Sequence, residues 1–140
     1  MVDNKKAQSL VAIMIVVAVI ALFLRIFIGQ FLESMLTQNE SEALSSLKLV
    51  SAALENYAKD HLGAYPESLD MLLKAQPPYL DKDYSAQGAL RGYLLECPRT
   101  DPTGYSCVSA PARCNFTGRK KYAVTTAGVF SQENCFKAGK

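Results

Sequence analysis

The sequence predicts an α+β fold: a long N-terminal helix, partly transmembrane and partly amphipathic, packs on a small antiparallel β-sheet. Three observations predict it: an uninterrupted apolar segment near the N-terminus, apolar residues at helical spacing after it, and short β-prone segments separated by turn signals. We expect three parts, namely a basic leader-like segment (1–7), a transmembrane helix (8–32) and a head outside the membrane (33–140).

The apolar segment has the length of a membrane span. No polar side chain occurs from Leu10 to Leu24, and after Arg25 the apolar character continues to Leu32. A helix over these residues is roughly 34 Å long, which is enough to cross the hydrocarbon of a bilayer. The alternative, a cleaved secretory signal, has a shorter apolar core followed by a small-residue cleavage site, and no such site follows Leu24.

Charges beside the span predict its orientation. Lys5 and Lys6 precede it, whereas Glu33, Glu40 and Glu42 follow it. Because cations concentrate on the cytoplasmic side of membrane spans, we expect a cytoplasmic N-terminus and a head on the opposite side. The net charge of the chain is only +2 and its cations are scattered, so no nucleic-acid partner is expected.

The helix is expected to continue outside the membrane over residues 33–62. No Gly or Pro occurs between Gln30 and Leu62, and Gly63 then offers a left-handed cap. Apolar residues recur every three or four positions and form one stripe. Because the stripe is short and interrupted, we expect it to pack on its own head rather than in a coiled coil. The stripe comprises Leu36, Ala43, Leu44, Leu47, Val50, Leu54, Tyr57, Ala58 and Leu62, and the polar interruptions are Thr37, Glu40 and Ser51.

Turn signals order the remainder of the head. A short helix is predicted at residues 66–75, and Gln76-Pro77-Pro78 is expected to end it. An irregular loop is predicted at residues 80–90. A sheet is predicted within residues 92–130. Its strands are expected at Gly92–Cys97, Tyr105–Ala110, Lys121–Thr126 and, more briefly, Val129–Phe130.

The four cysteines, all in the C-terminal third, predict two disulfides in a head outside the cytoplasm. Three pairings are possible. Cys97 and Cys107 flank a turn-like segment, which favours a bridge across a hairpin and leaves Cys114 with Cys135. A zinc site is the competing interpretation, but the sequence has no Cys-x-x-Cys pair, and its single histidine, His61, lies far upstream.

Several motifs together resemble type IV prepilins and type II secretion pseudopilins. Lys5-Lys6-Ala7 followed by Gln8-Ser9-Leu10-Val11 and the apolar helix is similar to the start of these proteins. Gly63-Ala64-Tyr65-Pro66, the short helix after it and Pro77-Pro78-Tyr79-Leu80 resemble the middle of the major pseudopilin. Tyr122-Ala123-Val124-Thr125-Thr126-Ala127-Gly128-Val129 resembles the final strands.

This resemblance implies a pilin-like filament subunit of a type IV pilus or a type II secretion pseudopilus, anchored in a bacterial inner membrane. A prepilin peptidase is expected to cleave between Ala7 and Gln8, after which Gln8 becomes N-methylated. The partners are then further copies or other pilin-like subunits. The expected assembly residues are Leu10, Val11, Ile13, Ile15, Val16, Val19, Phe23 and Arg25.

Two departures from the family pattern matter. At the predicted cleavage site, Ala7 replaces the more usual glycine and Gln8 replaces an aromatic residue. Members usually carry a glutamate at the fifth residue of the processed chain, where it neutralises a neighbour's terminal amine, and this chain has Ala12 there. Some minor tip subunits also lack the acid. Ala12 favours the alternative hypothesis, a signal-anchored periplasmic binding module that does not polymerise.

Other polar candidates carry weaker signals. Arg25 either meets a carboxylate of another subunit or extends to the headgroups. Asp81 and Asp83 lack the further oxygen ligands that calcium needs, and we expect a solvated loop. No catalytic constellation, metal or cofactor is expected, because His61 lacks a nucleophile pattern and is expected at a helix C-terminus. A basic cluster, expected to be a solvated face, comprises Arg113, Arg119, Lys120 and Lys121.

Overall fold

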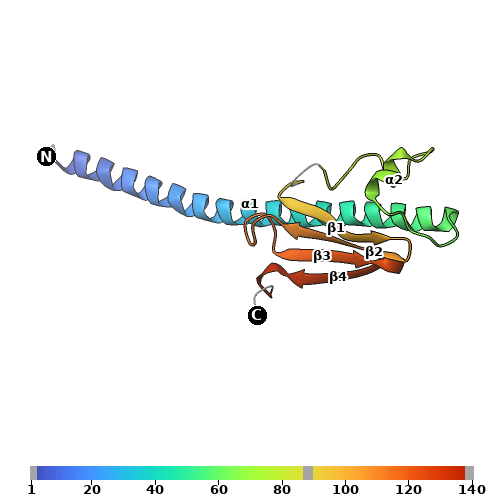
Figure 1. Cartoon of the computed structure of the whole chain (residues 1–140). Coiled ribbons are helices and arrows are strands. Elements are labelled where there is room, and N and C mark those ends of the chain that lie inside the picture. The colour runs from blue at the N-terminus through green and yellow to red at the C-terminus, as the bar shows by residue number, and fades with distance from the viewer. Residues whose placement is uncertain (1–2, 87–89, 138–140) are drawn as a thin grey trace. The chain divides into compact units, whose positions relative to one another are not determined.

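A computed structural model describes residues 3–86 and 90–137, and it confirms the predicted α+β fold. Helix α1 (Asp3–Asp60) comes first and helix α2 (Leu69–Lys74) second. Four strands follow (Figure 1), namely β1 (Tyr93–Asp101), β2 (Gly104–Pro111), β3 (Lys120–Thr125) and β4 (Val129–Asn134), with short 3₁₀ turns at Thr126–Gly128 and Cys135–Lys137. The chain divides into two compact units between Met35 and Leu36, and each unit is described by itself.

The first unit is helical throughout its described residues, 3–35. No helix breaker interrupts the predicted span, and Gly29 lies within the continuous helix. α1 is the one helix among the described residues that is long and apolar enough to cross a membrane. Residues 1 and 2 of the leader-like segment, and the side chains of Lys5 and Lys6, lie outside the described part.

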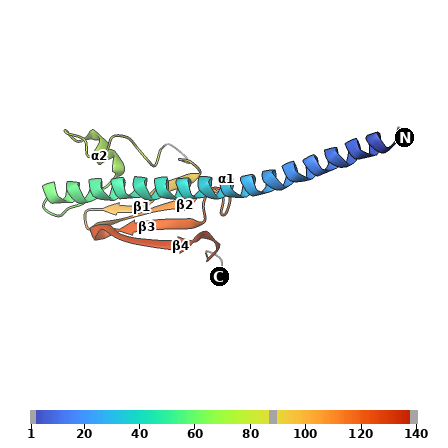
Figure 2. The same cartoon turned by 180° about the vertical axis from the view of Figure 1, so that it is seen from behind.

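The second unit, which we call the head, is a four-stranded antiparallel meander in the order β1-β2-β3-β4. The sheet lies along one side of the C-terminal part of α1, and α2 with its flanking loops lies on another side (Figure 2). The stripe of α1 is therefore buried within its own head, as predicted. Leu47, Val50 and Leu54 are fully buried against Tyr93, Tyr105 and Val124 of the strands and Leu72 of α2.

The helix ends slightly earlier than predicted. α1 stops at Asp60, and Leu62 and Gly63 both adopt positive φ angles, of 58° and 90°. The Gly63 N–H donates to the carbonyl oxygen of Ala58 at 2.7 Å. Gly63 therefore caps the C-terminus of the helix, as predicted. The assignment of Leu62 to the buried stripe was wrong: its side chain is fully exposed because the chain has already left the helix.

Other boundaries also shift. The short helix covers Leu69–Lys74 rather than residues 66–75, because Pro66 to Ser68 form the turn into it. β1 continues past Pro98 to Asp101 through an irregularity between Glu96 and Arg99, which accommodates the proline on an edge strand. β4 runs on to Asn134 although its last residues are polar and exposed.

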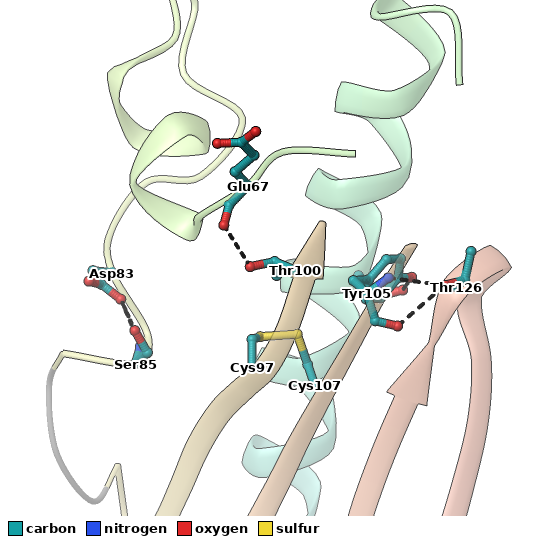
Figure 3. The surroundings of a disulfide bond; sticks show 9 residues. Glu67, Asp83, Ser85, Cys97, Thr100, Tyr105, Cys107 and Thr126 are labelled. Atoms are coloured by element: carbon teal, nitrogen blue, oxygen red, sulfur yellow. Dashed lines mark hydrogen bonds between the residues drawn. A yellow bond between two sulfur atoms is a disulfide. The ribbon is translucent and has the colours of Figure 1, made fainter. Parts of the chain in front are cut away.

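Both disulfides have the predicted pairing. Cys97 on β1 bonds Cys107 on β2, as Figure 3 shows, and Cys114 bonds Cys135. The first bridge joins neighbouring strands, and the second ties the β2–β3 connection to the end of β4. All four cysteines are thus used within the head.

Candidate functional site

The residues predicted to mediate assembly lie on the first unit of α1, and their apolar side chains are exposed in the isolated chain. Large apolar side chains from Leu10 to Leu32 range from 44% exposed at Val19 to 74% at Phe27. A water-soluble helix hides such groups on at least one face. This segment therefore presents a surface that requires a cover.

The apolar surface surrounds the helix completely. At about 100° per residue, Leu10 and Val19 lie on opposite sides of α1, and Val11 and Val16 occupy other directions. A helix that is apolar all round is typical of a membrane span or of the interior of a bundle. Covering a Val, Leu, Ile or Phe side chain contributes about 1.5–3 kcal/mol, so covering this segment stabilises by on the order of tens of kcal/mol.

Arg25 is the one ionisable residue within residues 8–32. Its neighbours one turn away, Ala21, Leu22, Ile28 and Gly29, are apolar, so none supplies a carboxylate. Glu33 follows two turns later, near the end of the span. A counter-charge for Arg25 at its own level must therefore come from another molecule, while its long side chain also allows it to reach the headgroups.

The predicted processing site lies in the first turns of the same helix. Ala7 and Gln8 are helical and exposed, and Ala12 lies one turn after Gln8 on the same face. Alanine offers no hydrogen bond or charge to a neighbouring N-terminus. The geometry thus places a methyl group where the family pattern has a carboxylate.

Two polar contacts join α1 to the sheet side of the head. They involve Glu40 and Ser51, which interrupt the apolar stripe in the sequence. Glu40 accepts the backbone N–H of Arg119 at 2.9 Å and lies 3.5 Å from the Arg119 guanidinium. Ser51 lies 2.9 Å from the Tyr105 hydroxyl, which also donates to Glu55 at 3.0 Å. Burial raises the pKa of Tyr105 to about 12, and proximity to the Glu55 carboxylate adds to the rise.

These contacts explain why polar residues recur on the buried side of the helix. The Glu40 Oε1 atom accepts a hydrogen bond from the connection before β3, and the Ser51 hydroxyl is hydrogen-bonded to the Tyr105 hydroxyl of β2. No buried side-chain nitrogen or oxygen in the described residues lacks a hydrogen-bond partner. The partner of Glu40 lies 79 positions away in the sequence. The residues next to Glu40 therefore do not show whether its side chain is buried and bonded or faces water.

The candidate calcium carboxylates bind their own loop instead. Asp83 accepts the N–H groups of Ser85 and Ala86 at 2.8 and 3.1 Å and the Ser85 hydroxyl at 2.6 Å (Figure 3). These bonds, led by the one from the Ser85 side chain, lower the pKa of Asp83. Asp81 accepts the Tyr84 hydroxyl at 3.0 Å. No group of three His, Cys, Asp or Glu residues able to hold a metal occurs within residues 3–86 and 90–137.

His61 behaves as a helix-terminal residue. Its Nδ1 lies 2.8 Å from the carbonyl oxygen of Tyr57, and its ring stacks on the Tyr57 ring with the centroids 3.8 Å apart. Both contacts are local to the last turn of α1. They agree with the predicted position at the helix C-terminus.

The residues of the predicted basic cluster differ in their surroundings. Arg119 is engaged with Glu40, and Lys121 pairs in register with Glu133 across the β3–β4 ladder. Arg113 lies instead in the β2–β3 connection, and Lys120 at the adjoining start of β3. Arg113, Arg119 and Lys120 thus lie within residues 112–120, and Lys121 follows on β3.

Comparisons with known proteins assign no family to the chain. No protein-family model, curated protein or solved structure matches it. The likeness to pilins therefore stays a prediction from the motifs of this sequence.

Proposed function

We propose that this protein is a membrane-anchored filament subunit, pilin-like or pseudopilin-like, that assembles through its N-terminal apolar helix. One observation carries the proposal: α1 is apolar and exposed on every side over residues 10–24, and further along it buries a single stripe under its own head. The apolar stripe of the head is therefore covered by the head itself, whereas the apolar side chains of the first unit require lipid or other helices to cover them.

The same surface suits both environments. Lipid tails are about as apolar as the side chains of neighbouring helices, so moving this helix from bilayer to bundle leaves the hydrophobic contribution nearly unchanged. Shape complementarity and polar contacts then decide whether helices associate. Arg25 is the residue best suited to add such a contact, because a carboxylate from a second subunit neutralises it in a low-dielectric interior.

The proposed location is the inner membrane of a bacterium, with a cytoplasmic N-terminus and a periplasmic or extracellular head. The order of charges around the span supports this orientation. The disulfides also support it, because such bonds persist outside the reducing cytoplasm.

A second candidate function is a signal-anchored periplasmic binding module that does not polymerise. Ala12 favours it, since the chain lacks the carboxylate that fixes the register of neighbouring subunits in the family pattern. In that case, lipid alone covers the apolar helix.

Mass spectrometry of the N-terminus tests the two candidates. For a filament subunit, membranes from cells that contain a prepilin peptidase yield a chain beginning at Gln8 with one added methyl group. The same expression in cells without the peptidase yields the full chain, which serves as the control. A retained Met1 in both strains contradicts the pilin-like route and favours the anchored module.

A further inference from the structure

One end of the head combines exposed aromatic rings with cations. The β2–β3 connection, residues 112–119, packs on the first turn of α1 within the head: the Asn39 amide donates to the Thr117 carbonyl oxygen at 3.1 Å. The segment after β4 reaches the same place, because the Cys135 N–H donates to the Arg119 carbonyl oxygen at 3.0 Å. We call residues 112–120 and 135–136 the base of the head.

Two phenylalanines protrude from this base. Phe116 is 82% exposed and Phe136 is 75% exposed, which are the highest values for aromatic residues in the head. The Cys114–Cys135 disulfide, with Cα atoms 5.8 Å apart, links the segments that carry them. Chain geometry then keeps the two phenylalanine Cα atoms within about 17 Å of each other.

The loop that presents Phe116 is internally hydrogen-bonded. The N–H groups of Phe116 and Thr117 donate to the Arg113 carbonyl oxygen at 3.1 and 3.0 Å, and the Asn115 N–H donates to Gly118 at 2.8 Å. The Thr117 hydroxyl also bonds the backbone of Arg113. The exposed ring thus sits on a defined turn rather than on a loose tether.

The charge at the base is positive. Arg113 and Lys120 contribute cations. Of the acids of α1 within the head, Glu40 pairs with Arg119, which is itself part of the base, and Glu42 pairs with Arg91 at 2.8 Å. The described part of the base contains no acidic residue.

The chain keeps this base close to the apolar helix. Asn39, which contacts the base, comes only seven residues after Leu32. Seven residues span about 10 Å as a helix and at most about 25 Å when fully extended. When residues 8–32 occupy the bilayer, the chain therefore holds Asn39 within about 25 Å of the end of the span.

We propose that the base of the head docks on the anionic headgroups of the membrane that holds the chain, with Phe116 and Phe136 inserted at the boundary with the acyl chains. Aromatic residues and cations together are the combination that binds such an interface. The inference rests on the anchoring half of the proposed function and not on polymerisation.

Tryptophan fluorescence tests the proposal, because the chain contains no tryptophan. The full-length variants Phe116→Trp and Phe136→Trp are reconstituted in phosphatidylcholine liposomes with and without phosphatidylglycerol. We expect blue-shifted emission and quenching by brominated acyl chains, stronger with phosphatidylglycerol. Arg113→Gln combined with Lys120→Gln is expected to remove the dependence on phosphatidylglycerol.

Leu62→Trp is the matched control, since Leu62 is fully exposed and lies beyond the other end of about 30 Å of head helix. Its emission is expected to stay red-shifted and unquenched. Equal emission from positions 116 and 62 overturns the proposal. A blue shift that grows with protein-to-lipid ratio without quenching also overturns it, because another subunit then covers the base. Flotation of the same liposomes reports anchoring separately, so a failure of anchoring is distinguished from a failure of docking.

Discussion

The two parts of α1 have the same backbone and opposite surfaces. Over residues 10–24 every side chain is apolar and exposed, whereas over residues 40–58 apolar and small side chains form one stripe buried under the sheet and α2. The polar residues that alternate with that stripe either face water or, like Glu40 and Ser51, form hydrogen bonds with other parts of the head.

The comparison shows that the arrangement of polar residues, rather than helix formation itself, selects the partner of each part. A one-sided stripe is satisfied by the sheet of the same chain. An apolar surface on all sides cannot be satisfied by one sheet, so it requires lipid or several neighbouring helices. Substitutions matched between the two parts test this difference.

The largest effect is expected for Leu54→Ala, compared with Leu22→Ala. Leu54 is fully buried in the head, so its truncation removes contacts and leaves a cavity that costs about 4 kcal/mol of head stability. Leu22 is 63% exposed in the first unit, and its truncation is expected to leave head stability unchanged. Urea unfolding in detergent, followed by near-ultraviolet circular dichroism, measures both, and equal losses are inconsistent with the comparison.

An introduced charge is expected to affect the first unit strongly and the head weakly, the reverse of the truncations to alanine. Ile20 and Leu49 are 52% and 54% exposed in the isolated chain, so exposure alone does not separate them. Ile20→Lys places an ammonium near the centre of the span and disfavours insertion by about 3 kcal/mol, while Leu49→Lys changes head stability by less than about 0.5 kcal/mol. Carbonate extraction of membranes measures retention. Because the span as a whole contributes on the order of tens of kcal/mol, retention of Ile20→Lys is expected to fall only in part. A loss of head stability clearly above about 0.5 kcal/mol in either variant contradicts the comparison.

Alkali is expected to act on the head alone. The pKa of Tyr105 is about 12 in the folded head and near 10 when unfolded, so its contribution is complete below pH 10 and is lost as pH rises through about 12. Flotation with liposomes, which reports the anchoring by residues 8–32, is the control and should not change. Melting temperatures between pH 9 and 12 measure the head. A melting temperature that does not fall, or falls equally in Tyr105→Phe, rules out this tyrosine as the cause.

The smallest effect is expected at the outer face of the head helix. Glu42 and Arg91 form an ion pair at 2.8 Å with both side chains substantially exposed. Such pairs contribute about 0–1 kcal/mol and weaken with salt. A double-mutant cycle of Glu42→Gln and Arg91→Gln measures the coupling, and a value well above this range shows that the exposed face contributes more to stability than the comparison allows.

Local patterns predicted most of the fold. The apolar stripe predicted the packing of α1 on its own head, and the turn between Cys97 and Cys107 predicted their bridge. Two strands are longer than predicted. β1 continues past Pro98, which an edge strand tolerates, and β4 continues through the polar residues after Phe130.

The long-range polar contacts could not be predicted in this way. Nothing near Glu40 in the sequence indicates that its partner is Arg119, because the pairing depends on how the β2–β3 connection folds back on α1. The same holds for the base of the head. Phe116 and Phe136 are 20 positions apart in the sequence. The β3–β4 pairing, the Cys135–Arg119 hydrogen bond and the Cys114–Cys135 bridge bring their segments together.

Cross-linking inside the membrane tests most directly whether copies of the apolar helix cover one another. All four native cysteines are paired, so introduced cysteines are the only free thiols. Leu10 and Val19 lie on opposite sides of α1, so Leu10→Cys combined with Val19→Cys can link a chain of helices, whereas each single variant can link only two. After oxidation of membranes with copper phenanthroline, we expect a ladder of trimers and larger species from the double variant and dimers from each single variant. Monomers alone, or dimers that disappear when the membranes are diluted with lipid, contradict assembly through this helix.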